Sequence, residues 1–228
     1  MNENVFLTFD IDWASDDIIL SVAEQLVEAK VKSTWFVTHE TPILEFFRSR
    51  KNLFNLGIHP NFLKGTTQGD SEEEILKNLM AIVPEAKVIR THGVFQYGKL
   101  LSDIVNLTPI RIDSSIFLPE MKNIETVEHL TPNGILKRIP ILWADDYELL
   151  KENSDWQASK YFLHPGHKLF LFHPIHIFLN TVNMDHYNNY KHFNEIMINN
   201  ENKGTNVFFS RLLDYINENK ISTKFLTE

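Results

Sequence analysis

The sequence predicts an α/β fold in which helices cover a mainly parallel sheet. Short apolar runs that suit strands alternate along the chain with segments of helical periodicity, and these runs are apolar throughout rather than half polar. Several of the runs end in an aspartate, an arginine or a histidine. Because parallel α/β folds gather their sites at the carboxyl ends of the strands, these polar ends predict one shared site.

The first quarter of the chain alternates regularly between strand and helix patterns. Ser15 followed by two aspartates favours a helix start, because acidic side chains stabilise the positive end of a helix. Thr41 and Pro42 favour a second helix start, since proline fits the first helical turn. The expected elements are strands at 6–13, 33–37 and 53–59, with helices at 15–29 and from 41 onward.

The alternation continues beyond residue 70 and then carries an insertion. Ser71 with Glu74 three residues later is a capping box, which predicts a helix there. An Asn-Gly pair within 125–141 favours a hairpin turn, so we expect an inserted β-hairpin that lies over the site. Residues 206–219 are strongly amphipathic and predict a closing helix. The other expected elements are helices at 71–82 and 99–105, with strands at 87–90, 110–113 and 168–172.

Composition and charge exclude several classes of function. The 228 residues are 43% apolar, which suffices for one core, and we expect one domain covering 1–228. A net charge of −8 with scattered basic residues argues against a nucleic-acid partner. No run approaches the ~18 apolar residues of a membrane span, and no export signal precedes the first strand. We therefore expect a cytoplasmic protein, whose oligomeric state the sequence leaves open.

Polar residues with metal-binding or catalytic chemistry lie at the expected strand ends. Side chains alternate along a strand, so Asp10 and Asp12 share one face. The chain has no cysteine, so a tightly held transition metal would need imidazole and carboxylate ligands. The plain alternative is that these side chains only cap turns and bond to backbone. The groups are Asp10 with Asp12, His59, Arg90 with His92, and His173 with His176.

The order of these motifs resembles that of the polysaccharide deacetylase superfamily, of the carbohydrate esterase family 4 (CE4) type. Within it, the chain is most similar to a branch encoded in bacterial O-antigen clusters. Residues 8–12 resemble the first family motif and residues 169–173 the last, and the likeness extends from residue 5 to about residue 180. The resemblance implies a distorted, incomplete (β/α) barrel of about seven strands, and a divalent metal, most simply Zn²⁺.

The resemblance also implies a role for each matched residue. Asp10 would be the general base, Arg90 would hold it in place, and His173 would be the general acid. Asp12 and His59 would bind the metal.

Position 63 departs from the family pattern. Leu63 stands where the family has a second metal-binding histidine. Either His92 supplies the missing ligand, or Asn61 does so weakly, or the metal site is lost. We prefer His92, because imidazole binds Zn²⁺ far better than an amide does.

Further residues are candidates for contact with the substrate. Asp145 and Asp146 loosely match the fourth family motif, and they either tune His173 or cap the next element. Aromatic side chains after strand ends could stack on a sugar, although packing in the core is the commoner use. The candidates for substrate contact are Asn61, Trp143, Asp145, Asp146 and His176.

The sequence thus predicts a metal-dependent hydrolase of a sugar-linked amide. The simplest version is an N-deacetylase of an acylated amino sugar in cell-surface polysaccharide synthesis, with a nucleotide- or lipid-linked glycan as its substrate. Two alternatives stay open. One is a barrel that has lost catalysis and serves as a glycan-binding or scaffolding protein, and the other is a hydrolase of a small non-sugar amide.

Overall fold

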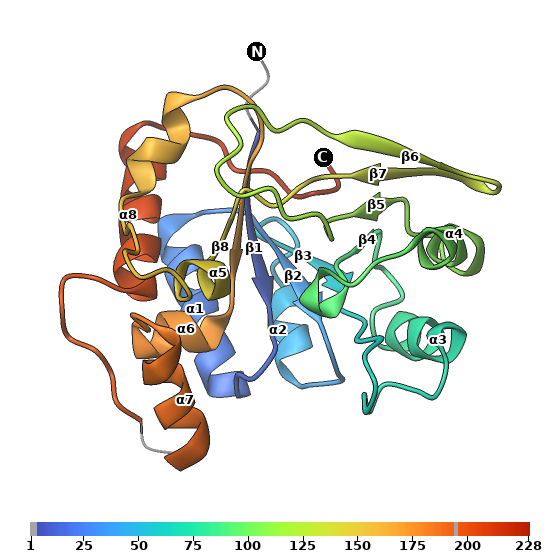
Figure 1. Cartoon of the computed structure of the whole chain (residues 1–228), viewed down its shortest axis with the longest axis horizontal. Helices are drawn as coiled ribbons and strands as arrows, with labels where there is room; N and C mark the ends of the chain where they lie inside the picture. The colour runs from blue at the N-terminus through green and yellow to red at the C-terminus, as the bar shows by residue number, and fades with distance from the viewer. Residues whose placement is uncertain (1–3, 194–195) are drawn as a thin grey trace.

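The computed structural model describes residues 4–193 and 196–228, which form a curled, open sheet flanked by helices (Figure 1). The strand order is β6-β7-β5-β4-β3-β2-β1-β9-β8, and every pair is parallel except β6 with β7. The strands are β1 Val5–Asp10, β2 Ser33–Val37, β3 Phe54–Ile58, β4 Val88–Ile89, β5 Ile112–Asp113, β6 Val127–Thr131, β7 Gly134–Arg138, β8 Trp143–Ala144 and β9 Lys168–Phe172.

The expected mainly parallel sheet with helical cover is confirmed, but the sheet has nine strands rather than about seven. The difference arises at one edge. The predicted hairpin forms, yet β7 pairs in parallel with β5, so both hairpin strands extend the sheet instead of standing apart from it. The hairpin projects from that edge in Figure 1.

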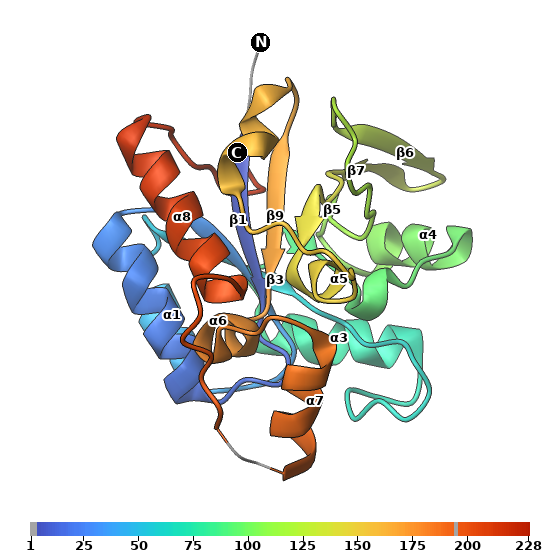
Figure 2. The ribbon, with the colours of Figure 1, turned by 60° about the vertical axis from the view of Figure 1, so that its left-hand side comes forward.

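The helices pack in two groups along the sheet. Helices α1, α6 and α8 pack together near β1, while α3 and α4 pack together toward the hairpin edge (Figures 1 and 2). Helices α5 and α6 are too short to show a helical period in the sequence, and α7 is too polar to show an apolar stripe. The helices are α1 Asp16–Ala29, α2 Ile43–Arg48, α3 Glu72–Ile82, α4 Gly98–Leu107, α5 Asp145–Glu148, α6 Pro174–Leu179, α7 Met184–Phe193 and α8 Thr205–Glu218, with 3₁₀ turns η1 His92–Val94 and η2 Ala158–Leu163.

The alternation of side chains along β1 divides the core into two parts. Leu7, Phe9 and Ile11 belong to the large cluster between the sheet and its helices, where the Phe9 ring stacks on Trp35 with 4.4 Å between centroids. Phe6 points to the other, concave side and joins a smaller cluster there. The same alternation directs the polar side chains at the strand end toward the concave side.

Local signals set the helix starts largely as expected. The Ser71 hydroxyl accepts a hydrogen bond from the Glu74 backbone N–H at 3.2 Å, which begins α3. The Glu74 carboxylate accepts from the Asp70 N–H, one residue before the position that a regular capping box would use. Within the described residues, no helix combines the length and apolar character that a membrane crossing requires.

Candidate active site

The predicted site residues meet at one rim of the sheet. Asp10 is the last residue of β1, and four others directly follow a strand: His59 after β3, Arg90 after β4, Asp145 after β8 and His173 after β9. All five strands run in parallel, so their carboxyl ends share this rim. Figure 2 shows β1 and β9 running side by side toward α6, where the rim lies.

Three side chains direct donor atoms at a common point. Asp12 Oδ2 lies 2.9 Å from His59 Nε2 and 3.5 Å from His92 Nδ1, and the two imidazole nitrogens are 3.3 Å apart. Ligands around tetrahedral zinc are separated by about 3.3 Å when each bond is ~2.0 Å long. Asp12 Oδ2 is buried and makes no regular hydrogen bond within the described residues. This geometry and donor set fit a divalent cation.

The charge of Asp12 suits a metal ligand, whereas a cation would have to displace a proton from His59. Burial by itself would raise the pKa of Asp12, but His59 and His92 outweigh burial and hold that pKa well below its usual range. Asp12 is therefore a carboxylate at neutral pH, the form that binds a metal. Burial lowers the pKa of His59, but Asp10 and Asp12 outweigh it and raise the pKa above its ordinary value.

The local turn after His59 occupies the side-chain oxygen of Asn61, the weaker of the two candidate third ligands. The Asn61 side-chain oxygen accepts a hydrogen bond from the Leu63 backbone N–H at 2.9 Å. Leu63 itself is 44% exposed. Of the alternatives left open by the sequence, the geometry favours His92.

Asp10 is held beside these ligands by a buried arginine. Arg90 Nη1 donates to Asp10 Oδ1 at 2.9 Å, and Asp10 Oδ2 lies 3.8 Å from His59 Nε2. Arg90 is itself fixed, because its other nitrogens donate to the Thr8 hydroxyl and to the Ser114 carbonyl. A carboxylate held in this way is fixed in position and direction, as a general base must be.

His173 forms a buried pair with Asp145 across the rim. His173 Nδ1 lies 2.7 Å from Asp145 Oδ1, and the His173 backbone N–H donates to Asp145 Oδ2 at 2.6 Å. Burial opposes the charging of His173, but Asp145 outweighs burial and raises the pKa of His173 to about 10. His173 therefore carries a proton at neutral pH. Its bond to Asp145 through Nδ1 leaves Nε2 for the substrate side.

A cavity of about 270 Å³ opens beside these groups. One side is lined by Asp10, His59, Arg90, His92 and His173, and the other side is apolar. None of its described lining residues belongs to β6 or β7, and of the predicted insertion at 125–141 only Ile141 lines the cavity, so the two hairpin strands themselves lie away from the site. The apolar lining residues are Val94, Phe117, Ile141, Ala144, Leu150 and Leu171.

Trp13 forms the exposed rim of the cavity. Its ring stacks on His173 with centroids 5.0 Å apart, and its edge contacts His92. The residue is 49% exposed and has a φ of 62°, a left-handed conformation that is rare outside glycine and is often kept for function. Its place at the end of the strand expected over 6–13 was the only sequence signal for Trp13.

Four of the predicted substrate contacts differ from their expected places. Trp143 is 3% exposed and stacks on Phe208 with centroids 4.1 Å apart, so that prediction was wrong and the residue belongs to the core. Asp145 is fully buried and pairs with His173, in line with the alternative that it tunes that histidine; His176 is also fully buried, while Asn61 serves the local turn. These four are not among the described residues that line the cavity.

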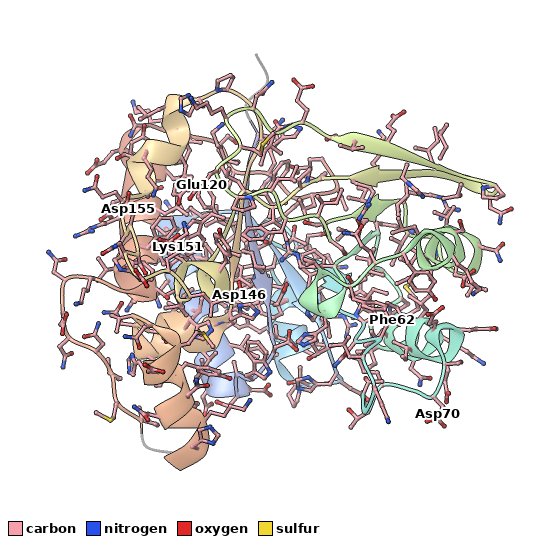
Figure 3. All side chains as sticks on the ribbon, in the orientation of Figure 1. Phe62, Asp70, Glu120, Asp146, Lys151 and Asp155 are labelled. Carbon is pink, nitrogen blue, oxygen red and sulfur yellow. The ribbon has the colours of Figure 1, made fainter. Side chains whose placement is uncertain are left out.

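Asp146 is the predicted substrate contact that does line the cavity. Burial raises its pKa above the ordinary value. Figure 3 shows Asp146 near the middle of the molecule at α5, and Phe62, another aromatic after a strand end, close to α3. Phe62 packs against the large core cluster.

Polar residues at the end of β5 support the site but carried no recognised motif. Ser114 contacts Arg90 through its carbonyl and its hydroxyl, and Ser115 bonds to the backbone of Thr91. The run Asp113-Ser114-Ser115 ends a predicted strand, as the other site residues do. Their position at the end of a predicted strand was the sequence signal that could have identified them as site residues.

Comparison with known proteins places the chain in a family. The family model described as WbmS-like polysaccharide deacetylase matches residues 7–191. The crystal structure of a candidate polysaccharide deacetylase involved in O-antigen biosynthesis from Bordetella bronchiseptica is 30% identical, with a TM-score of 0.78. That alignment covers 92% of this chain and 90% of that one. No curated protein matches the chain.

More distant structures share the fold. A family 4 acetyl xylan esterase from Clostridium thermocellum, in complex with a cobalt ion, is 13% identical with a TM-score of 0.54, covering 99% of this chain and 89% of that one. A CE4 family pseudoenzyme from Bacillus anthracis is 12% identical with a TM-score of 0.51, covering 98% and 63%. The extent of the family match and the 30% identical relative lead to one conclusion: the chain belongs to the WbmS-like polysaccharide deacetylase family.

Proposed function

We propose that the protein is a metal-dependent N-deacetylase that acts on an acylated amino sugar in O-antigen biosynthesis. The observation that carries this proposal is the convergence of Asp12, His59 and His92 beside Asp10 and His173. Family membership and the O-antigen role of the 30% identical relative support a glycan substrate. A nucleotide- or lipid-linked glycan in the cytoplasm is the version of the substrate that we propose.

The ligand group and the base would act together on the acyl carbon. A divalent cation held by Asp12, His59 and His92, most simply Zn²⁺, would polarise the acyl carbonyl and lower the pKa of water at the site. Asp10 is positioned to accept the proton of the attacking water, since Arg90 holds its carboxylate at 2.9 Å. The C–O bond forms as that proton moves to Asp10.

His173 would complete the reaction by protonating the leaving amine. Its raised pKa of about 10 keeps it protonated at neutral pH, and Asp145 fixes the orientation of the ring. When the C–N bond breaks, the proton passes from His173 to the nitrogen, so that the products are a carboxylic acid and a free amino sugar. The apolar side of the cavity would receive the acyl group.

The metal content of the purified protein tests this proposal first. Elemental mass spectrometry of protein prepared without added metal should find about one zinc per wild-type chain. Asp12→Ala, His59→Ala and His92→Ala should each lower that content. His164→Ala is the matched control, because this histidine lies in an exposed loop.

The metal measurement separates the hydrolase from a barrel without catalysis. Stoichiometric zinc would justify a turnover screen of N-acetylated amino sugars against small amides, which distinguishes the two kinds of hydrolase. A wild-type protein that retains no metal even after zinc is added would contradict the proposal. That result would favour a glycan-binding barrel without catalysis.

A further inference from the structure

The turn that carries His92 has a strained backbone. Gly93 has a φ of 62° and Val94 a φ of 49°, so two consecutive residues are left-handed. A β-branched residue such as Val94 is a genuine outlier in that region. Conformations of this kind persist only where surrounding contacts hold them, so contacts behind the turn must stabilise it.

Ser115, just beyond β5, ties both ends of this turn. Its hydroxyl accepts a hydrogen bond from the Thr91 backbone N–H at 2.9 Å, and its carbonyl accepts from Gln96 Nε2 at 2.8 Å. Within the turn, the Thr91 hydroxyl donates to the Phe95 carbonyl at 2.7 Å. The segment that presents His92 is therefore closed at its first and last residues.

A buried ion pair supports Ser115 in turn. The Ser115 hydroxyl donates to Asp113 Oδ1 at 2.5 Å, and Arg138 Nε donates to Asp113 Oδ2 at 2.7 Å. Arg138 also donates through Nη2 to the Gln96 side-chain oxygen, which closes a ring of contacts. Asp113 and Ser115 are fully buried and Arg138 is 7% exposed, so solvent weakens this ring little.

We propose that Asp113, Ser115 and Arg138 are positioning residues that hold His92 as a metal ligand, an inference that rests on the proposed function. The loop after His59 holds only the start of this turn, because the His92 backbone N–H donates to the Pro60 carbonyl at 2.9 Å, and the left-handed residues that follow need other support. The hairpin edge supplies that support instead, since Arg138 is the last residue of β7. Groups behind a ligand that fix its orientation commonly contribute about 10- to 100-fold in metal affinity.

The test measures zinc affinity by competition with a chromophoric chelator in a double-mutant cycle. We expect Ser115→Ala to weaken binding about tenfold in the wild-type background. In a His92→Ala background, the same substitution should change the affinity by less than about twofold, because it acts through His92. A general structural effect of Ser115→Ala would instead weaken binding equally in both backgrounds.

Hydrogen exchange on the zinc-free protein supplies a second readout that needs no metal. Ser115→Ala should speed amide exchange across residues 91–95 and leave residues 54–59 unchanged. If His92→Ala binds zinc too weakly to measure, this local loss of protection decides the question. Exchange that is unchanged at 91–95, or equally fast in both segments, would overturn the inference.

Two variants on β7 separate the charge of Arg138 from its position. Arg138→Met should weaken zinc binding, and Arg138→Lys should restore part of the loss through Asp113. Lys137→Met is the matched control, since Lys137 is the exposed neighbour on the same strand.

An unchanged affinity in Ser115→Ala beside a weakened His92→Ala would overturn only this inference. An unchanged affinity in His92→Ala would overturn the proposed ligand set, and this inference with it.

Discussion

The two sides of the candidate active site differ in how far the protein alone satisfies them. In the acid half, Asp145 and His173, both carboxylate oxygens are bonded, one to the ring and one to the backbone of the histidine. In the metal half, Asp12, His59 and His92, the buried atom Asp12 Oδ2 makes no regular hydrogen bond within the described residues, and it lies 2.9 Å from His59 Nε2.

This difference follows from the work that each half would do. A general acid must have its proton and its direction set in advance, and a bonded carboxylate provides both. A metal ligand must instead keep a lone pair free for the cation, so its donor atoms converge without satisfying one another. The acid half thus has its polar atoms paired within the protein, whereas the proposed cation would complete the metal half.

The largest expected effect lies between the halves, at Asp10. Asp10→Asn should lower turnover by about 10²- to 10⁴-fold, because the amide accepts no proton, while zinc content stays unchanged. Steady-state assays and elemental mass spectrometry on one preparation check both statements. Asp17→Asn, an exposed aspartate in the first turn of α1, is the control. Unimpaired hydrolysis by Asp10→Asn would remove the base from the mechanism.

Breaking the acid half should change the pH dependence of stability. The folded pKa of His173 is raised from 6.5 to about 10, so the pair stabilises the fold fully below pH 6.5 and loses that contribution as the pH rises toward 10. Asp145→Asn should remove this slope, and losing one partner of a buried pair costs on the order of 3–5 kcal/mol.

Urea unfolding of zinc-free protein between pH 6 and pH 10 measures this effect, since a bound cation would itself change the pKa of His173. The informative quantity is the wild-type free energy of unfolding minus that of Asp145→Asn at each pH. A difference that stays constant over this range would contradict the assigned protonation of His173.

Zinc should stabilise the metal half and depend little on the acid half. A ligand that binds only the folded state adds about 2.7 kcal/mol to the free energy of unfolding when its concentration is 100 times the dissociation constant. Differential scanning fluorimetry should therefore show a higher midpoint with zinc for the wild type and for Asp145→Asn. Asp12→Ala should show no such rise. A zinc-dependent rise in Asp12→Ala equal to that of the wild type would move the cation elsewhere.

The smallest expected effects on stability and kinetics distinguish Trp13 at the rim from Trp143 in the core. Trp143→Phe should lower the free energy of unfolding by about 1 kcal/mol and leave KM unchanged, because Trp143 packs on Phe208 in the core. Trp13→Phe should change kcat or KM with little loss of stability, since Trp13 is half exposed over His173. Urea unfolding and steady-state kinetics of both variants check this contrast, and a changed KM in Trp143→Phe would reverse it.

Local patterns predicted much of the fold. The Ser71 cap, the β9 strand and the amphipathic α8 helix all occur where periodicity and capping chemistry indicated them. The alternation expected over 6–13 predicted that Asp10 and Asp12 share a face; β1 ends at Asp10 and Asp12 lies in the turn that follows, yet both still come together beside His173. The pattern was silent on α7, whose sequence is polar over much of its length.

The choice among distant partners required the tertiary structure. From the chain alone, His92 and Asn61 were both possible third ligands, and Trp143 was as near to a strand end as Trp13. The edge on which the hairpin lies was equally open, although that edge brings Arg138 to Asp113.

The sequence by itself determined which residues end strands, which face they take and what chemistry they carry. Only the tertiary structure decided which strand ends adjoin one another, and hence that His92 meets Asp12 while Asp145 meets His173. The physical reason is the distance along the chain over which each signal acts, because periodicity and caps involve only a few neighbouring residues. Strand order and ring orientation instead depend on packing between segments far apart in the chain, as in the bond from the Thr8 hydroxyl to the Phe170 carbonyl, 162 residues away.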